Sequence, residues 1–489
     1  MRLLTVHGHF YQPPRENPWL DEVEREEGAA PFHDWNERIT AECYSPNADN
    51  LQKISFNFGP TLLSWLQSHH PDTYAKILEA DRISRAQRGG HGNAIAQAYN
   101  HVIMPLASRR DKVTQVRWGI EDFRHRFGRD PEGMWLPETA VDKETLAILA
   151  ETGLRFTILA PSQARRIRRL GDGRWKNVEG GGIDPSQAYH YAVGEDRSVT
   201  LFFYDSPISR AIAFEGALAD GETLGARLLA GFSVDRGRPQ LVNVATDGES
   251  YGHHHRNGAA TLAVALGKIE SGGDVTLTNY GAFLAGHSPI HEVEIIERTS
   301  WSCTHGVDRW RSDCGCRVGH PGWHQRWRAP LREALNWLRD QLDPFYEARL
   351  GKLLKNPWDA RDDYIQVILD PSEESRAAFF SRHQRGPIEP PRQVEALRLL
   401  ELQRQRLLMF TSCGWFFDDI SGLEAVQVLK YAARAMQLAA GLGFSGLEEE
   451  FLRRLKAAPS NLPDFGEGAE VYRRLVAAAS RGSAGRRDP

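Results

Sequence analysis

Two carboxyl residues, Glu138 and Asp247, each follow a short apolar run. The run GMWLPE (133–138) ends in Glu138, and LVNVAT (241–246) is followed by Asp247 and, two residues later, Glu249. Paired carboxyl groups of this kind cleave glycosidic bonds, because one attacks the anomeric carbon and the other protonates the leaving oxygen. One of them must keep its proton near neutral pH, which burial and a negative neighbour can arrange. The alternative is that both residues only cap helices or form salt bridges in loops.

Histidines suggest a second kind of chemistry. His7 and His9 end the first apolar run, RLLTVHGHF, in a pattern also typical of metal-dependent hydrolases, in which both imidazoles bind the metal. Further ligands would come from His91, His101, Asp247 or His253. However, the chain has no His-Glu-x-x-His pattern, and neutral histidines often bind sugar hydroxyls instead. We therefore expect no catalytic metal and no cofactor, and we keep metal-dependent hydrolysis as the alternative.

A segment rich in tryptophan and cysteine, residues 297–327, holds a third group of reactive residues. Cys303, His305, Cys314 and Cys316 have the residue types of a Cys3His zinc site, although a Cys-x-Cys pair is tighter than the usual spacing. The alternative is a packed loop with inert thiols. The sequence leaves this choice open.

The elements that must position these residues follow an alternating pattern. Apolar runs predict strands at 2–10, 53–59, 133–138, 155–160, 200–205 and 241–246, with helices at 109–128, 142–153 and 261–273 among them. Repeated strand–helix units favour a parallel sheet, and over this length they favour a barrel. Because active sites of such barrels lie at the carboxyl ends of the strands, the polar residues that follow these runs should converge.

The predicted domains are a (β/α)7-type parallel barrel and a C-terminal α-helical domain. The barrel takes residues 1–295, with an irregular, glycine-rich insertion at about 161–240. A connecting segment follows at 296–330, then the helical domain at 331–478 and a disordered tail at 479–489. The helical domain is indicated by apolar residues at spacings of three and four along 329–354, 392–410 and 421–443.

Composition excludes several classes of partner. The chain has 489 residues and a formal net charge of −4, which argues against nucleic acid and membrane surfaces as partners. No apolar run is long enough to span a bilayer, and the apolar run near the N-terminus is too short for a signal peptide. Five cysteines do not form a disulfide framework, so we expect a cytoplasmic protein. Its 13 tryptophans suit a sugar partner, because the indole stacks on sugar rings. Nothing in the sequence indicates the oligomeric state.

Three stretches together resemble glycoside hydrolase family 57: HGHFYQPP, GMWLPETA and TDGESYGHH. The resemblance covers roughly the first 300 residues. It implies a (β/α)7 barrel closed over by a helical domain, and a retaining reaction on α-glucans without a metal, by hydrolysis or by transfer to another sugar. Glu138 would be the nucleophile and Asp247 the general acid/base. His7 and His9 would lie beside the sugar next to the scissile bond.

The sequence also departs from the family. Phe10 and Tyr11 separate His9 from Gln12, where better-known members have no intervening residue. The stretch GNAIAQAYNHVIMPL lacks the Glu that some members place there and offers Gln97 and His101 instead. The C-terminal part resembles a less characterised branch whose tail domain has no assigned activity. These departures leave the sugar and its linkage undecided.

We therefore predict a retaining glycoside hydrolase or transglycosylase for α-linked oligo- or polysaccharides, acting through a glycosyl-enzyme intermediate. A non-catalytic carbohydrate-binding protein is a further alternative. The expected catalytic residues are Glu138 and Asp247. The expected substrate-binding residues are His7, His9, Gln12, Gln97, His101, Trp135, Glu249, His253, Trp301 and Trp415.

Overall fold

The computed structural model describes residues 1–233 and 237–482, and the chain divides into two compact units. The barrel unit comprises residues 1–12, 25–99 and 122–302. The helical unit comprises residues 13–24, 100–121 and those from 303 onward. Two segments of the N-terminal region thus belong to the helical unit, which the sequence prediction did not anticipate.

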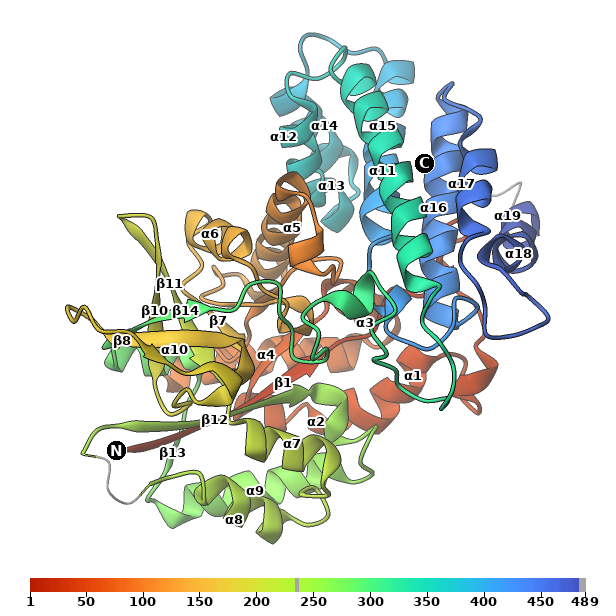
Figure 1. Ribbon diagram of the computed structural model, residues 1–489. Coiled ribbons are helices and arrows are strands. Elements are labelled where there is room, and N and C mark those ends of the chain that lie inside the picture. Colours follow the sequence, from red (N-terminus) through yellow and green to blue (C-terminus); the bar gives the residue numbers. More distant parts are fainter. Residues whose placement is uncertain (234–236, 483–489) are drawn as a thin grey trace. The chain divides into compact units, whose positions relative to one another are not determined.

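The barrel unit is built on parallel strands (Figure 1). In the described residues seven strands form the barrel: β1 (Arg2–Phe10), β4 (Ser55–Phe58), β5 (Ala96–Gln97), β6 (Met134–Trp135), β7 (Phe156–Leu159), β11 (Arg197–Phe203) and β12 (Gln240–Asp247). β1 pairs in parallel with β12 and β4, β5 pairs with β6, and β7 pairs with β11. Single parallel bridges, Phe56–Ala94 and Gly133–Phe156, join these pairs into one series.

The series closes between β11 and β12. The Asp205 N–H, just beyond β11, donates to the Asn243 carbonyl of β12 at 2.7 Å. The Asn243 side chain donates in turn to the carbonyl oxygens of Phe203 and Pro185. The prediction of a (β/α)7-type parallel barrel is confirmed. β1 and β12 are buried almost throughout, as expected for parallel strands covered on both faces.

Helices alternate with these strands and cover them (Figure 1). Those between and after the strands are α1 (Trp35–Ile39), α2 (Ser45–Asn47), α3 (Pro60–His69), α4 (Pro71–Gln87), α5 (Arg109–Phe127), α6 (Lys143–Glu151), α7 (Ser206–Phe214), α8 (Gly221–Leu229), α9 (Gly258–Gly272) and α10 (Tyr280–Gly286). The predicted helices at 109–128, 142–153 and 261–273 correspond to α5, α6 and α9. Asp142, Asp205 and Asn279 each begin a helix by accepting a backbone N–H, as helix N-caps do.

The stretch from 161 to 240 carries strands of its own. Three strands of this stretch extend the sheet beyond β11: β8 (Ala164–Arg169), β9 (Lys176–Asn177) and β10 (Ala188–Val193). They are joined there by β14 (His291–Ile295), which comes later in the chain. β10 pairs antiparallel with β11, and β8 pairs antiparallel with β14. Three short strands lie elsewhere: β2 (Glu16–Asn17), β3 (Glu22–Val23) and β13 (Thr276–Leu277), the last beside β1.

The helical unit contains long helices where the apolar spacing predicts them. Its helices from residue 303 onward are α11 (Arg328–Leu350), α12 (Pro357–Asp363), α13 (Ile365–Leu369), α14 (Glu373–His383), α15 (Pro390–Leu408), α16 (Leu423–Gly441), α17 (Leu447–Leu455), α18 (Gly468–Val471) and α19 (Ala477–Gly482). The tail predicted to be disordered from residue 479 begins inside α19, which extends as far as Gly482. Residues 483–489 lie outside the described part.

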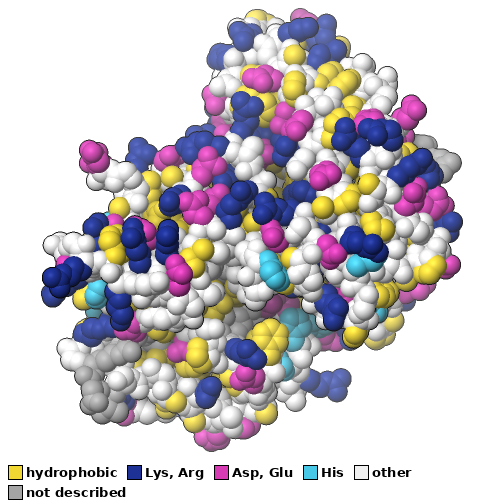
Figure 2. Space-filling view, viewed as in Figure 1, with side chains coloured by type: hydrophobic (Ala, Val, Ile, Leu, Met, Phe, Trp, Pro, Cys, Tyr) yellow, Lys and Arg dark blue, Asp and Glu magenta, His cyan; other side chains and the backbone are white. Residues whose placement is uncertain are grey.

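No helix in the described residues is both long enough and apolar enough to cross a bilayer. Figure 2 shows basic and acidic side chains interspersed over most of the visible face, rather than gathered into one basic patch. This agrees with the formal net charge of −4 and gives no support to a nucleic-acid partner.

Candidate active site

Glu138 follows β6 on a strained turn. The 3-10 turn η5 (Pro137–Thr139) places Glu138 at φ 57° and ψ 21°, the left-handed region that residues with a Cβ seldom adopt. Such strain costs on the order of 1–3 kcal/mol and persists where the surroundings fix it, typically at functional sites. Here the backbone of Trp301 donates to the Glu138 carbonyl at 3.0 Å, which fixes the turn from outside.

Two side chains hold the Glu138 carboxylate. The Trp301 indole N–H donates to Oε2 at 3.0 Å, and the Ser302 hydroxyl donates to the same oxygen at 2.5 Å. Donors directed at a carboxylate favour its ionised form. An ionised, fixed carboxylate is what a nucleophile requires.

Asp247 is the last residue of β12. Its side chain is accessible to solvent, although the seven preceding residues of the strand are buried. Protein nevertheless surrounds it closely enough that desolvation raises its pKa well above the ordinary value, and the negative charges of Glu249 and Glu138 raise it further. A carboxyl group that keeps its proton beside an ionised one is suited to protonate a leaving oxygen.

Glu249 is buried behind Asp247. Its Oε1 accepts from the backbone N–H of Tyr11 at 3.0 Å and from the Tyr44 hydroxyl at 2.7 Å. Burial raises the pKa of Glu249 to about 7, against these hydrogen bonds, which lower it. When Glu249 is ionised, its negative charge raises the pKa of Asp247. Its own hydrogen bonds are with Tyr11 and Tyr44.

His7 and His9 are linked through Asn57. His7 Nδ1 lies 3.0 Å from Ser55 Oγ, and His7 Nε2 lies 3.1 Å from Asn57 Oδ1. Asn57 Nδ2 lies 3.0 Å from His9 Nδ1 and donates to Gln97 Oε1 at 2.7 Å. Asn57 Oδ1 also lies 3.3 Å from His9 Nδ1, so the Asn57 amide contacts both imidazoles.

Both histidines are neutral. Burial lowers the pKa of each to about 3, the positive charge of a protonated His9 lowers that of His7 further, and the Asn57 hydrogen bond raises both. Their rings stack on Trp135, with centroids 5.0 Å away for His7 and 4.9 Å for His9. A neutral imidazole stacked on an aromatic ring, such as that of His9, is suited to bind a sugar hydroxyl rather than an anion.

Trp135 and Trp301 form the aromatic part of the site. Trp301 meets Trp135 edge to face at 5.1 Å, and it meets His9 and Tyr204 at 6.4 and 6.2 Å. Tyr204 lies close enough to Asp247 for the carboxylate to raise the pKa of the phenol, in addition to the larger effect of burial. These aromatic side chains therefore connect the surroundings of Glu138 with those of Asp247.

The remaining predicted site residues lie in different surroundings. The Gln12 side chain donates to the Tyr11 carbonyl at 3.0 Å. His253 Nδ1 contacts Glu42 Oε2 at 2.5 Å, and the His253 ring meets Trp35 edge to face.

His101 and Trp415 belong to the helical unit. His101 Nδ1 lies 2.6 Å from Ser412 Oγ, and the His101 carbonyl accepts from the Ser412 N–H. Trp415 is fully buried, donates to the Arg328 carbonyl and lies under the Arg332 guanidinium. These are the contacts of a core residue, so the proposed sugar site does not include Trp415.

Several residues of the site are absent from the sequence prediction. They are Ser302 on Glu138, Asn57 between the histidines, Tyr204 near Asp247, and Tyr11 and Tyr44 on Glu249. Asn57 and Tyr204 occur at the ends of predicted strands, so the rule that selected Glu138 applies to them as well. Ser302 and Tyr44 follow no such rule.

Both parts of the chain match known families. The family model described as glycosyl hydrolase family 57 matches residues 26–279, and a domain of unknown function, DUF3536, matches residues 323–484. Alpha-amylase 1 of Dictyoglomus thermophilum is 24% identical over 200 residues, 41% of this chain and 26% of that protein. The 4-alpha-glucanotransferase of Thermococcus litoralis is 24% identical over 157 residues, 32% of this chain and 21% of that protein. The matches thus span about a quarter of the length of these relatives.

Solved structures share the fold over the whole chain. An exo-type maltose-forming amylase from Pyrococcus sp. ST04 superposes with a TM-score of 0.72 at 17% identity, covering 99% of this chain and 94% of that one. A family 57 branching enzyme from Pyrococcus horikoshii superposes with a TM-score of 0.58 at 15% identity, covering 100% and 97%. The family model covers more than half of the 489 residues. The chain therefore belongs to glycosyl hydrolase family 57.

Proposed function

We propose that this protein is a retaining glycoside hydrolase or transglycosylase that acts on α-linked glucans through a covalent glycosyl-enzyme intermediate. Glu138 is the nucleophile and Asp247 is the general acid/base. The observation that carries the proposal is the contrast between the two carboxyl groups. Glu138 is held by two hydrogen-bond donors, whereas desolvation and two negative neighbours raise the pKa of Asp247 well above its ordinary value.

The reaction follows from this contrast. In the first step Glu138 attacks the anomeric carbon while Asp247 gives its proton to the leaving oxygen, so the glycosidic bond breaks as the glycosyl ester forms. In the second step Asp247, now ionised, takes a proton from water or from a sugar hydroxyl, which attacks the anomeric carbon and frees Glu138. His9 and Gln97 are the proposed sugar contacts, and the fully buried His7 and Trp135 hold them in place, since both ring nitrogens of His7 face Ser55 and Asn57. The Gln97 amide nitrogen is buried without a protein partner in the described residues.

The α-glucan class is supported by the relatives, which are named for amylase and glucanotransferase activities. A cytoplasmic location is supported by five free thiols, which a reducing compartment preserves. Substrate contacts are also predicted for Gln12, His101 and His253. Substitution of each residue would test whether it binds the sugar.

Trapping tests the proposal directly. The protein is incubated with a 5-fluoro α-glycosyl fluoride, which slows the second step more than the first, and is then digested and analysed by mass spectrometry. We expect one glycosyl adduct, on Glu138. Proton NMR of the first product from maltooligosaccharides should show retention of the α-anomer. Product of inverted configuration, or a label elsewhere, would overturn the assignment.

Metal-dependent hydrolysis through His7 and His9 is less well supported. Both ring nitrogens of His7 already face side chains, Ser55 and Asn57. In the described residues neither histidine belongs to a group of three or more side chains placed to share an ion. A non-catalytic sugar-binding protein would show glucan binding without turnover in the same assays.

A further inference from the structure

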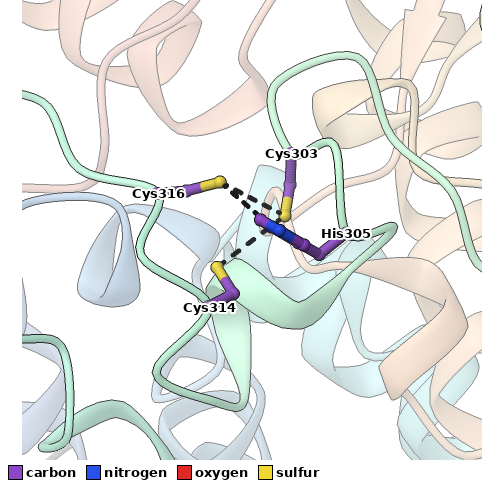
Figure 3. Close-up of side chains that lie close together, drawn as sticks. All are labelled: Cys303, His305, Cys314 and Cys316. Carbon is purple, nitrogen blue, oxygen red and sulfur yellow. Dashed lines mark hydrogen bonds between the residues drawn. The ribbon is translucent and has the colours of Figure 1, made fainter.

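Four metal-binding side chains meet in the segment of the helical unit that precedes α11. Cys303, His305, Cys314 and Cys316 each offer one ligand atom, and these atoms all lie within 4.8 Å of one another. Figure 3 shows the three sulfurs and the imidazole turned toward a common point, although the four residues come from two separate turns of the chain. Such convergence requires a cause, because thiols and an imidazole have little mutual attraction.

The distances fit a tetrahedral metal ion. Cys303 Sγ lies 3.9 Å from Cys314 Sγ and 3.8 Å from Cys316 Sγ, and Cys316 Sγ lies 3.6 Å from His305 Nδ1. A tetrahedral zinc, about 2.3 Å from sulfur and about 2.0 Å from nitrogen, separates two sulfurs by about 3.8 Å and sulfur from nitrogen by about 3.5 Å. The three observed distances agree with this geometry. We propose that Cys303, His305, Cys314 and Cys316 bind one zinc ion as a closed structural site.

The backbone conformation around the cluster also favours a metal site. Gly315, between Cys314 and Cys316, has φ of 80°, a left-handed conformation that bends the chain so that both sulfurs reach one point. Backbone N–H groups of His305 and Arg309 are directed at the Cys303 sulfur, and that of Cys316 at the Cys314 sulfur. N–H groups that bond to thiolate sulfur are typical of the surroundings of zinc ligands.

The charges near the cluster also suit a zinc site. Three thiolates and a neutral imidazole give a zinc ion a net charge of −1. Arg328 is fully buried and donates to the carbonyl oxygens of Cys316, Phe416 and Phe417. Arg309, also buried, lies close enough to affect the Cys316 thiol. Buried guanidinium groups need a nearby negative charge, which the metal centre and Asp418 would supply together.

The role follows from the ligand count and from the local fold. Four protein ligands leave no open position for water or substrate, so the ion would be structural rather than catalytic. Residues 303–327, all described, contain one helical element, the three-residue η9 (Asp308–Trp310). A metal ion would stabilise this irregular segment where secondary structure does not.

Cobalt substitution provides the first test. The full-length protein, purified without a metal-affinity tag, is unfolded under reducing conditions with a chelator, refolded with Co²⁺ and examined by absorption spectroscopy. We expect one cobalt per chain, with thiolate-to-cobalt charge-transfer bands and the intense visible bands of tetrahedral cobalt. Zn²⁺ should displace them. Weak octahedral bands, or no saturation at one equivalent, would overturn the proposal.

Variants provide the second test. Elemental analysis should find about one zinc per chain in the wild type and in Cys413→Ser, a matched control whose thiol lies outside the cluster. Cys316→Ser and His305→Ala should each lower the zinc content by at least about tenfold after dialysis against a chelator. Wild-type protein that holds no zinc when refolded with it, while its thiols in the cluster react freely with a disulfide reagent, would contradict the site.

Discussion

The Ser302 hydroxyl donates to Glu138 Oε2 at 2.5 Å, on the same oxygen that accepts from the Trp301 indole. Two neighbouring residues, far from Glu138 in sequence, therefore fix one carboxylate oxygen of the proposed nucleophile. Fixing this oxygen also sets the direction in which the second oxygen, Oε1, points. The backbone of Glu138 is in the left-handed region, which a residue with a Cβ disfavours. Contacts from Trp301 and Ser302, rather than a local backbone preference, therefore hold Glu138 in this conformation.

Loss of either donor should lower turnover without removing the carboxylate. Ser302→Ala and Trp301→Phe are each expected to reduce kcat by roughly 10- to 100-fold, with the smaller effect on KM, since a misplaced carboxylate attacks less often. Trp301→Phe removes the indole N–H and leaves a smaller aromatic ring next to Trp135. Steady-state kinetics on a maltooligosaccharide would measure both parameters, with exposed Ser271→Ala as the control. A large rise in KM at unchanged kcat would show that these residues bind sugar and do not position Glu138.

The two carboxyl groups should respond differently to leaving-group ability. Asp247→Asn is expected to lower kcat on maltooligosaccharides by about 10²–10⁴-fold, because no proton reaches the leaving oxygen. The same variant should retain most of its first step with a glycosyl fluoride, whose fluoride leaves without a full proton transfer. Glu138→Gln should be inactive on both substrates.

Azide separates these roles further. As a small nucleophile that needs no general base, azide should restore turnover of Asp247→Asn and give an α-glycosyl azide, since the Glu138 ester is intact. In Glu138→Ala azide can only replace the nucleophile and should give the β-azide. The opposite pairing of products would reverse the assignment of the two residues.

Much of the barrel follows from the sequence, because its strands are apolar runs followed by a polar residue. This pattern indicates β1, β4, β6, β7, β11 and β12, and it selects Glu138 and Asp247 as candidate catalytic residues. It does not indicate β5, which has two residues and no apolar run of its own, and which forms only because β4 and β6 lie beside it.

The grouping of the site residues was less predictable. Gln97 and His101 are four residues apart, yet Gln97 bonds Asn57 in the barrel unit, whereas His101 contacts Ser412 in the helical unit. Tertiary contacts of residues 100–121 decide this division, and a local pattern does not report them. The hydrogen bonds of Ser302 and Tyr44 are missed for the same reason, since each partner lies more than 150 residues away.

The basic limit of activity should depend on Glu249. The charge of Glu249 raises the pKa of Asp247, so Glu249→Gln removes a reason for Asp247 to keep its proton. The basic limb of kcat/KM should therefore move to lower pH. A pH profile of the variant beside exposed Glu270→Gln would measure the shift. A basic limb that does not move would mean that the charge of Glu249 has little effect on Asp247.

Glu249 should also make the fold less stable as pH rises. Its pKa is raised from 4.5 to about 7 in the folded chain, so the native state binds the proton more tightly than the unfolded state does. The resulting stability is complete below about pH 4.5 and is lost as the pH passes through about 7, at most about 3.5 kcal/mol at roughly 1.4 kcal/mol per pKa unit. Melting temperatures measured between pH 5 and 8 should fall in the wild type and fall less in Glu249→Gln. Equal slopes in the two proteins would show that the carboxyl group of Glu249 is not protonated in the folded chain.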